Sequence, residues 1–339
     1  MPHHRSPKRL MEITTGVWAA KALAEATRLD LFSQLSAAPG ATAGEVAARN
    51  GLAERPAELL LTACAALGLL RRAGDGYANT PEAEEYLVRG RPDYFGDAVL
   101  SLDRRYAGWM RLEEALRTDS PTNFDPAAKE SMFDPEDTAL TATFWKSMYA
   151  LSATSARALA AAYDFSPVRL LLDVGGGGAA YDIELCRAHP DLRCTVLDLP
   201  FVCELTGEGV AAAGLADRIA CMPGDFLRDA ELPGGHDAVL LSQILHDWDE
   251  ATNRLILDKC FAALPSGGRI LISELLVADS KDGPLLPALM SLNMLVSTWG
   301  RNYTAAEYGR WLAAAGFVDV TTVRFEGPGA DGAVVAVKP

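Results

Sequence analysis

The sequence predicts a protein in two parts, the second of which is an α/β domain with a doubly wound parallel sheet that ends in an antiparallel hairpin. From residue 168 onward, short apolar runs alternate with helical stretches, in the order LLLDV, TVLDL, IACMP, AVLLS and ILISELL. Strands separated by helices are typical of a parallel sheet with covering helices. Near the C-terminus, FVDVTTVRF and AVVAVK flank a Gly-Pro-Gly loop, which indicates an antiparallel edge hairpin.

The first part is predicted to be mostly helical. LMEITTGVWAAKALAEATRLDLFSQL has apolar residues at helical spacing, and ATAGEVAARNGL and RPAELLLTACAALGLL follow as two shorter helices. Two strand-like runs around a Gly-Asp-Gly turn come next, so the order is helix, helix, hairpin, as in winged-helix domains. We expect a winged-helix-like domain over residues 1–100, connecting helices over 101–165 and the sheet domain over 166–339.

Composition narrows the class of protein. The net charge is −14, and acidic residues outnumber arginines between residues 41 and 91. A DNA-reading surface needs clustered basic residues, so we expect no nucleic-acid partner. No apolar run is long enough to span a membrane, and the start MPHHRSPKRLMEI lacks the apolar core of a secretory signal. The six cysteines form no CxxC pair, which favours reduced thiols and a cytoplasmic location, without a metal site.

The stretch LLLDVGGGGAAYDIEL at residues 170–185 predicts a nucleotide-binding loop behind the first strand of the sheet. Gly175, Gly177 and Ala180 fit G-x-G-x-x-G/A, and Asp198 ends the next strand. This pattern also matches the fingerprint of NAD-dependent oxidoreductases. Asp173 favours another ligand, because a carboxylate before the loop repels a pyrophosphate but suits the ammonium and sulfonium groups of S-adenosylmethionine.

Two further motifs follow at the ends of later strands: GDF, which contains Asp225 and Phe226, and LHDWDE, which contains His246 and Trp248. With DVGGG, LDLP and GGRILISELL in this order, nearly the whole chain resembles the small-molecule O-methyltransferases that use S-adenosylmethionine. Plant caffeic-acid and isoflavone enzymes, animal acetylserotonin methyltransferase and bacterial antibiotic-tailoring enzymes belong to that family. The resemblance implies a seven-stranded Rossmann-like methyltransferase sheet and a homodimer formed through the N-terminal helices, with Trp18 close to the partner.

The resemblance also implies which residues hold the cofactor, whose product is S-adenosylhomocysteine. The methionine end lies at the strand-end acid and the glycines, the ribose at the acid after the second strand, and the adenine beside the residues that follow. Ser242 stands where the family often has Lys or Arg near the cofactor. The implied cofactor-binding residues are Asp173, Gly175, Gly177, Asp198, Leu199, Asp225, Phe226, Ser242 and Trp248.

His246 is the candidate general base. It follows a strand's C-terminal end beside the glycine loop, where parallel sheets keep their ligands. A phenol attacks a methyl group better once its proton is removed, and an imidazole suits this task. In the family, two acids flank this histidine; the first maps onto Glu274 and the second onto Asn302, an amide that orients the ring without supplying charge. We therefore expect a weaker base than in the plant enzymes of the family. We expect Asp247 and Asp249 to face solvent or cap the next helix.

The acceptor is expected between the connecting helix and the helix in PALMSLNMLVSTWG. Both helices carry soft apolar side chains at helical spacing, which suits a flat apolar molecule. The candidate lining residues are Phe144, Trp145, Met148, Met290, Asn293 and Met294. The predicted function is O-methylation of an aromatic hydroxyl in a bacterial antibiotic intermediate. The alternatives are C- or N-methylation on the same scaffold, and a ligand-sensing winged-helix regulator that binds DNA.

Overall fold

The computed structural model describes residues 6–125 and 138–339, except for the side chains of residues 138–144 and 146. The chain divides into two compact units, Met1–Arg104 and Arg105–Pro339. Each is described by itself.

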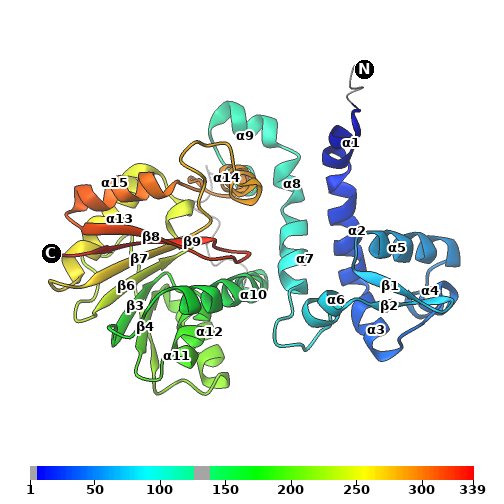
Figure 1. Cartoon of the computed structure of the whole chain (residues 1–339), viewed down its shortest axis with the longest axis horizontal. Coiled ribbons are helices and arrows are strands. Elements are labelled where there is room, and N and C mark those ends of the chain that lie inside the picture. Colours follow the sequence, from blue (N-terminus) through cyan, green and yellow to red (C-terminus); the bar gives the residue numbers. More distant parts are fainter. Residues whose placement is uncertain (1–5, 126–137) are drawn as a thin grey trace, which may run out of the picture. The chain divides into compact units, whose positions relative to one another are not determined.

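The first unit is a helical domain with one small hairpin (Figure 1). Thr42 begins one of its helices with a reciprocal capping box, in which its hydroxyl and the Glu45 carboxylate each accept a backbone N–H. The buried core gathers around Phe32 and Leu61, whereas Trp18 near the N-terminus is 67% exposed. The elements are α1 (Lys8–Thr14), α2 (Gly16–Arg28), α3 (Leu31–Ala37), α4 (Ala43–Asn50), α5 (Glu54–Ala66), β1 (Leu70–Ala73), β2 (Gly76–Asn79), α6 (Pro81–Tyr86) and α7 (Gly96–Arg104).

The second unit contains a seven-stranded sheet in the order β5-β4-β3-β6-β7-β9-β8. The first five strands along the chain are parallel, and β9 pairs antiparallel with both β7 and β8. The predicted doubly wound sheet with a terminal antiparallel hairpin is thereby confirmed. The strands are β3 (Leu170–Val174), β4 (Arg193–Asp198), β5 (Ile219–Pro223), β6 (Ala238–Ser242), β7 (Arg269–Glu274), β8 (Val318–Arg324) and β9 (Gly332–Val337).

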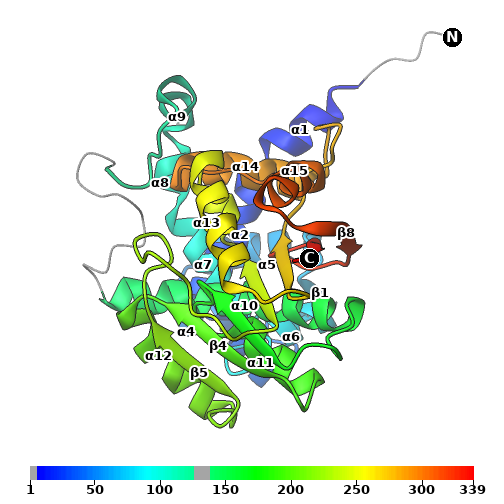
Figure 2. The same ribbon diagram turned by 90° about the vertical axis from the view of Figure 1, so that its left-hand side faces the viewer.

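Helices cover both faces of this sheet, as Figure 2 shows. On one face α10, α11 and α12 bury an apolar cluster that includes Leu159, Ile183 and Val210. On the other face α13 and α15 bury a second cluster around Leu257 and Trp311. The helices of this unit are α8 (Tyr106–Trp109), α9 (Leu112–Thr118), α10 (Thr138–Ala162), α11 (Ala180–Ala188), α12 (Pro200–Ala212), η1 (Leu245–Asp247), α13 (Glu250–Ala263), α14 (Leu285–Ser297) and α15 (Ala305–Ala315).

The chain order reverses at β3, because β4 lies on one side of it and β6 on the other. In an open parallel sheet, a crevice forms at such a reversal, outside the carboxyl ends of the strands. The strands that end at Val174, Asp198, Ser242 and Glu274 are parallel, so the loops after them begin at the same edge of the sheet. This edge is where the predicted motifs lie.

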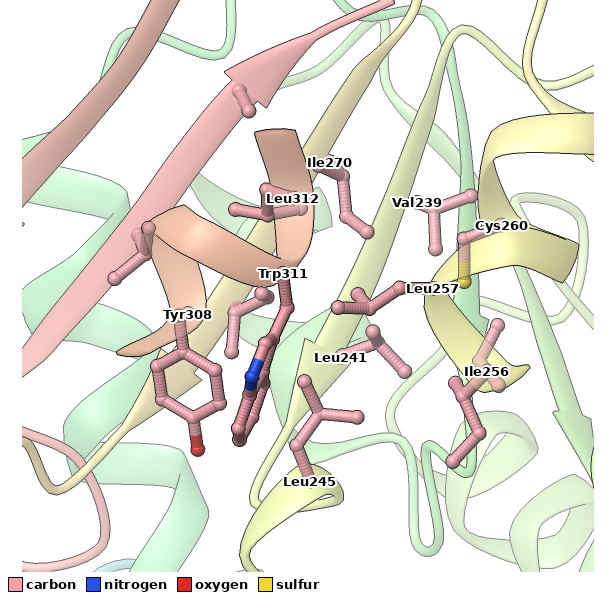
Figure 3. Close-up of a cluster of buried hydrophobic side chains, with 14 of the residues drawn as sticks. Val239, Leu241, Leu245, Ile256, Leu257, Cys260, Ile270, Tyr308, Trp311 and Leu312 are labelled. Atoms are coloured by element: carbon pink, nitrogen blue, oxygen red, sulfur yellow. The ribbon is translucent and has the colours of Figure 1, made fainter. Parts of the chain in front are cut away.

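The α13–α15 cluster allows a test of what stabilises the sheet domain (Figure 3). Leu257 on α13 is fully buried beside the sheet, whereas Leu255 on the same helix is 47% exposed. We predict that Leu257→Ala lowers the free energy of unfolding by about 2–5 kcal/mol, because it removes apolar contacts and leaves a cavity. Leu255→Ala should cost about 1 kcal/mol or less. Urea unfolding followed by circular dichroism measures both, and equal losses would contradict this account of the core.

Candidate functional site

The glycine loop turns sharply out of β3 into α11. Gly175 and Gly177 have φ angles of 74° and 55°, which glycine adopts without strain. Space is also restricted at both positions: a Cβ on Gly175 would lie 2.5 Å from Ile244 Cδ1, and one on Gly177 would lie 2.7 Å from Trp145 Cζ3. Side chains from the turn after β6 and from α10 thus approach the loop closely, and only glycine leaves room for a ligand as well.

Asp198, at the end of β4, holds the loop through the backbone. Its Oδ2 accepts a hydrogen bond from Gly177 N at 2.9 Å, and its Oδ1 accepts one from Leu199 N at 2.7 Å. Burial raises the pKa of this carboxyl to about 6, although both hydrogen bonds favour the ionised form. The bond to Gly177 ties the two predicted parts of the cofactor site together.

Asp173, the acid that precedes the loop, is fully buried, and neither of its carboxylate oxygens has a hydrogen-bond partner among the described residues. Burial and the neighbouring carboxyl of Asp182 raise its pKa well above the usual range. A buried acid without a partner is costly unless something compensates it. A ligand cation is one such partner, so this site suits an ammonium group.

The GDF segment follows β5, the edge strand that pairs with β4. Asp225 Oδ1 accepts hydrogen bonds from Leu227 N at 3.0 Å and Arg228 N at 3.2 Å, which fixes the turn after β5. The rings of Phe226 and Trp248 meet edge to face with centroids 6.5 Å apart. A Cβ on Gly175 would lie 3.3 Å from Phe226 Cε1. These aromatic side chains therefore border the glycine loop, and Leu199 and Ser242 lie at the neighbouring strand ends.

His246 lies in η1, directly after β6, and Glu274 at the end of β7 fixes it. Glu274 Oε1 accepts from the backbone N atoms of Ile244, Leu245 and His246 at 3.1, 3.1 and 3.4 Å. Its Oε2 lies 2.9 Å from His246 Nδ1, an ion-pair distance without the geometry of a linear hydrogen bond. One fully buried carboxylate therefore sets both the turn and the charge beside the ring.

The expectation for Asp247 is wrong. Its side chain is only 12% exposed, and its Oδ1 lies 3.7 Å from His246 Nε2. The cap of α13 is Asp249 alone, whose carboxylate accepts from Thr252 N. The 3₁₀ turn brings Asp247 back against the ring that precedes it, where Arg105 also acts on its charge. Sequence patterns do not predict that Arg105 lies near Asp247, because the two residues are far apart along the chain.

Asn302 has a different task from the one expected. Its Nδ2 donates to Leu275 O at 2.8 Å and its backbone N donates to Ser291 Oγ at 3.2 Å. Among the described residues, no hydrogen bond joins Asn302 to His246. The second acid beside the imidazole is Asp247, so the negative charge that Asn302 lacks is supplied from the neighbouring position.

These charges change the acidity of the imidazole. Burial disfavours the charged ring, but Glu274 and Asp247 favour it more strongly, and together these effects raise the pKa of His246 to about 9. Burial raises the pKa of Asp247 to about 6. His246 is therefore a stronger base than an ordinary histidine, and it carries a proton at neutral pH before any ligand binds.

The expected acceptor residues lie on two helices. Trp145 and Met148 are half-buried on α10, and Asn293 and Met294 are buried on α14. Asn293 Oδ1 accepts from Trp109 Nε1 at 3.1 Å, and its Nδ2 donates to Met290 Sδ at 3.5 Å. Trp109 lies on α8, and no motif in this short segment predicts a site residue there. The side chain of Phe144 lies outside the described part of the chain.

Metal-binding clusters and membrane-spanning helices were sought among the described residues. These residues include no group of three or more His, Cys, Asp and Glu placed to hold a metal ion. None of their helices is both long and apolar enough to cross a membrane.

Comparisons with known proteins identify the family to which this sequence and fold are similar. Residues 109–318 match the model of the O-methyltransferase domain, and residues 11–89 match that of the O-methyltransferase dimerisation domain. The chain is 54% identical to 3-hydroxy-5-methyl-1-naphthoate 3-O-methyltransferase of Streptomyces sahachiroi, over 99% of this chain and 97% of that protein. It is 35% identical to the tetracenomycin polyketide synthesis 8-O-methyl transferase of Streptomyces glaucescens, over 96% of both. The structure of human N-acetylserotonin methyltransferase in complex with SAM has a TM-score of 0.88 at 28% identity and covers 100% and 99% of the two chains.

The pKa of His246 makes a prediction about stability. Because that pKa is raised from about 6.5 in the unfolded chain to about 9, the stabilisation is fully present below pH 6.5 and is lost as the pH rises through 9. The loss amounts to about 3 kcal/mol. We predict that Glu274→Gln makes this fall in the free energy of unfolding clearly smaller, since it removes the nearest negative charge.

Urea unfolding at pH 6.5, 7.5 and 9 measures the effect, and an NMR titration of the histidine ring reads the pKa directly. Glu250→Gln is the control, because Glu250 lies on the surface in an ion pair with Arg254. An unchanged pH dependence in Glu274→Gln would show that Glu274 does not set the charge of the ring.

Proposed function

Because the chain belongs to the O-methyltransferase family, we propose that it transfers a methyl group from S-adenosylmethionine to the hydroxyl of an aromatic small molecule and releases S-adenosylhomocysteine. One observation carries this proposal: a buried histidine, held by Glu274 at Nδ1, lies at the same sheet edge as the glycine loop. This arrangement joins a base to a cofactor site.

The loop residues support the cofactor assignment. Gly175 and Gly177 leave the loop free of side chains, Asp198 is fixed at the next strand end, and Asp173 offers two unpartnered oxygens to an ammonium group. Asp225, Phe226 and Trp248 would hold the adenine side, with Leu199 and Ser242 near them. S-adenosylmethionine supplies a methyl group on a positively charged sulfur, which a nucleophilic oxygen attacks in line.

His246 would serve this attack by taking the proton of the hydroxyl at Nε2, since Nδ1 faces Glu274. The neighbouring carboxylates stabilise the imidazolium that forms. A histidine whose pKa is near 9 must first lose its resting proton, so the reaction favours mildly alkaline pH or an acceptor that arrives as a phenolate. Half-buried Arg105 adds a positive charge beside Asp247, which also favours an anionic acceptor.

The acceptor class follows from the relatives and from the apolar helices. The Streptomyces sahachiroi relative acts on a hydroxylated methylnaphthoate, and its 54% identity supports a hydroxylated bicyclic aromatic acid as the acceptor here. Trp145, Met148, Met290 and Met294 provide flat, adaptable apolar surface. We place this reaction in the assembly of a bacterial antibiotic-type secondary metabolite.

The first unit supports a homodimer. It matches the dimerisation domain, and its first helices expose Leu10, Met11, Ile13 and Trp18 at 65%, 56%, 62% and 67%. Apolar side chains exposed together indicate an interface. The two short helices followed by the β1–β2 hairpin support a winged-helix-like fold. Six cysteines without a disulfide support a cytoplasmic location.

The proposal is tested by incubating the protein with methyl-labelled S-adenosylmethionine and a panel of hydroxylated naphthoates, phenols and amines. Mass spectrometry detects the transferred methyl, and NMR locates it on oxygen, carbon or nitrogen. We predict O-methylation, with kcat lowered about 10²- to 10⁴-fold in His246→Ala and affinity for S-adenosylmethionine changed by about threefold or less.

His236→Ala is the matched control. His236 lies just before β6, at the opposite edge of the sheet, and its Nε2 is 3.1 Å from Thr195 Oγ1, so its loss should leave kcat unchanged. If His246→Ala lost cofactor binding as well as activity in calorimetry, His246 would be a structural residue. Methyl on carbon or nitrogen would move the reaction to the alternative class.

A further inference from the structure

A second acid lies directly behind the cofactor loop. Asp182 is in the first turn of α11, and its side chain is as fully buried as that of Asp173. None of the four carboxylate oxygens of the two residues has a hydrogen-bond partner among the described residues. Each carboxyl is, however, the neighbour that acts on the charge of the other. The two acids therefore form a buried pair.

Such a pair cannot stay doubly ionised. Two negative charges side by side in a dry interior repel each other and lose their hydration, so one proton is held between them. Burial, followed by the neighbouring Asp182, raises the pKa of Asp173 well above its usual range, and burial raises the pKa of Asp182 to about 6. Without a ligand, the pair therefore holds a single proton between its two carboxyl groups.

The groups around the pair provide no compensating cation. The charge of Asp198 on β4 acts on Asp173, the charge of Asp173 acts on Tyr181 of α11, and Cys194 on β4 lies beside Asp182. The charge of Asp182 also acts on the thiols of Cys186 and Cys221. Arg157 on α10 forms an ion pair with Glu184. All groups that face the two acids are acids, a phenol or thiols. In the described part of the chain, the pair thus lacks a positive partner, and the ligand is what supplies one.

We propose that Asp182 is a positioning residue for cofactor binding: it takes the shared proton when the ammonium group of S-adenosylmethionine arrives at Asp173, and donates it back as a hydrogen bond to the Asp173 carboxylate. The inference rests on the proposed function, in which Asp173 receives that ammonium group. Asp182 has no part in the predicted binding site, because it lies behind the loop and acts only through Asp173.

The proton moves only a short way and the charges balance. An ammonium group beside Asp173 favours the ionised form of that residue, so the proton passes across the hydrogen bond to Asp182. The pair keeps one negative charge, which matches the single positive charge of the ammonium group. The O–H of Asp182 then holds one Asp173 oxygen and leaves the other for the ligand, which a lone buried carboxylate does not achieve.

Two variants separate this role from simple filling of space. Asp182→Asn keeps the shape and a hydrogen-bond donor but does not ionise, whereas Asp182→Leu keeps much of the volume and donates nothing. We predict that Asp182→Asn binds S-adenosylhomocysteine within about threefold of wild type. Asp182→Leu should bind roughly 10- to 100-fold more weakly, the effect of losing a hydrogen bond to a charged group.

Calorimetry at pH 6, 7, 8 and 9 provides the pH profile. In Asp182→Leu the lone Asp173 is protonated by burial and must release that proton to solvent when the ammonium group binds, so its affinity should recover as the pH rises. The wild-type pair keeps its proton on binding, so the wild-type profile should be flatter than that of Asp182→Asn, in which Asp173 has no acid to receive the proton. Glu184→Gln is the matched control, two positions along the same helix and paired with Arg187; it should bind as wild type does. Circular dichroism checks that each variant folds.

Wild-type affinity in Asp182→Leu at every pH would overturn the inference, and so would equal losses in both variants. If Asp182→Leu does not fold, the number of protons exchanged on ligand binding tests the inference instead. Calorimetry in buffers of different ionisation enthalpy measures this number. The same number in wild type and in Asp182→Asn would refute the shared proton. The amino group of the ligand contributes equally to both. Failure of the wild type to bind S-adenosylhomocysteine would instead refute the proposed function itself, and unchanged binding in Asp173→Asn would refute the role of Asp173.

Discussion

The candidate site depends on the contacts that the carboxylate of Glu274 makes with the turn after β6. This residue ends β7, accepts the backbone N–H groups of Ile244, Leu245 and His246 from the turn after β6, and faces the ring of His246 with its second oxygen. A buried carboxylate needs several such partners to remain ionised. The same contacts therefore satisfy the acid, fix the turn and place the base, so that neither the turn nor the base is independent of the sheet.

A second buried acid, Asp173, lies near the end of β3, which β6 separates from β7, and its surroundings differ. Oε1 of Glu274 accepts backbone hydrogen bonds and Oε2 faces His246 Nδ1 at 2.9 Å, while the oxygens of Asp173 have no hydrogen-bond donor among the described residues. One acid is thus complete without a ligand and the other is left incomplete. This difference separates the two sides of the proposed reaction: the protein itself holds the base, whereas the cation of the cofactor completes the binding site.

The local sequence was sufficient for the fold and for the place of the strand-end motifs. Alternation of apolar runs predicted each strand of the sheet, and the reversed final hairpin was found where FVDVTTVRF and AVVAVK stand. It was not sufficient for Asp247, expected at a helix cap and found beside His246 Nε2, or for Asn302, whose amide binds Leu275 O. A short polar residue after a strand has several possible partners, and spacing along the chain does not choose among them.

The sequence by itself determined which residues end the parallel strands, because strand periodicity is local and parallel strands bring their carboxyl ends to one edge. Asp173 and Asp198 at strand ends and His246 just beyond one were singled out in this way, whereas Glu274 was expected only from the family resemblance. Only the tertiary structure decided what those side chains meet. The pairing of Asp182 with Asp173 arises from the packing of α11 on the sheet, and the charge on His246 arises from several strands and turns at once. Such contacts depend on the whole fold, since the pKa of a buried group is set by every charge and hydrogen bond around it.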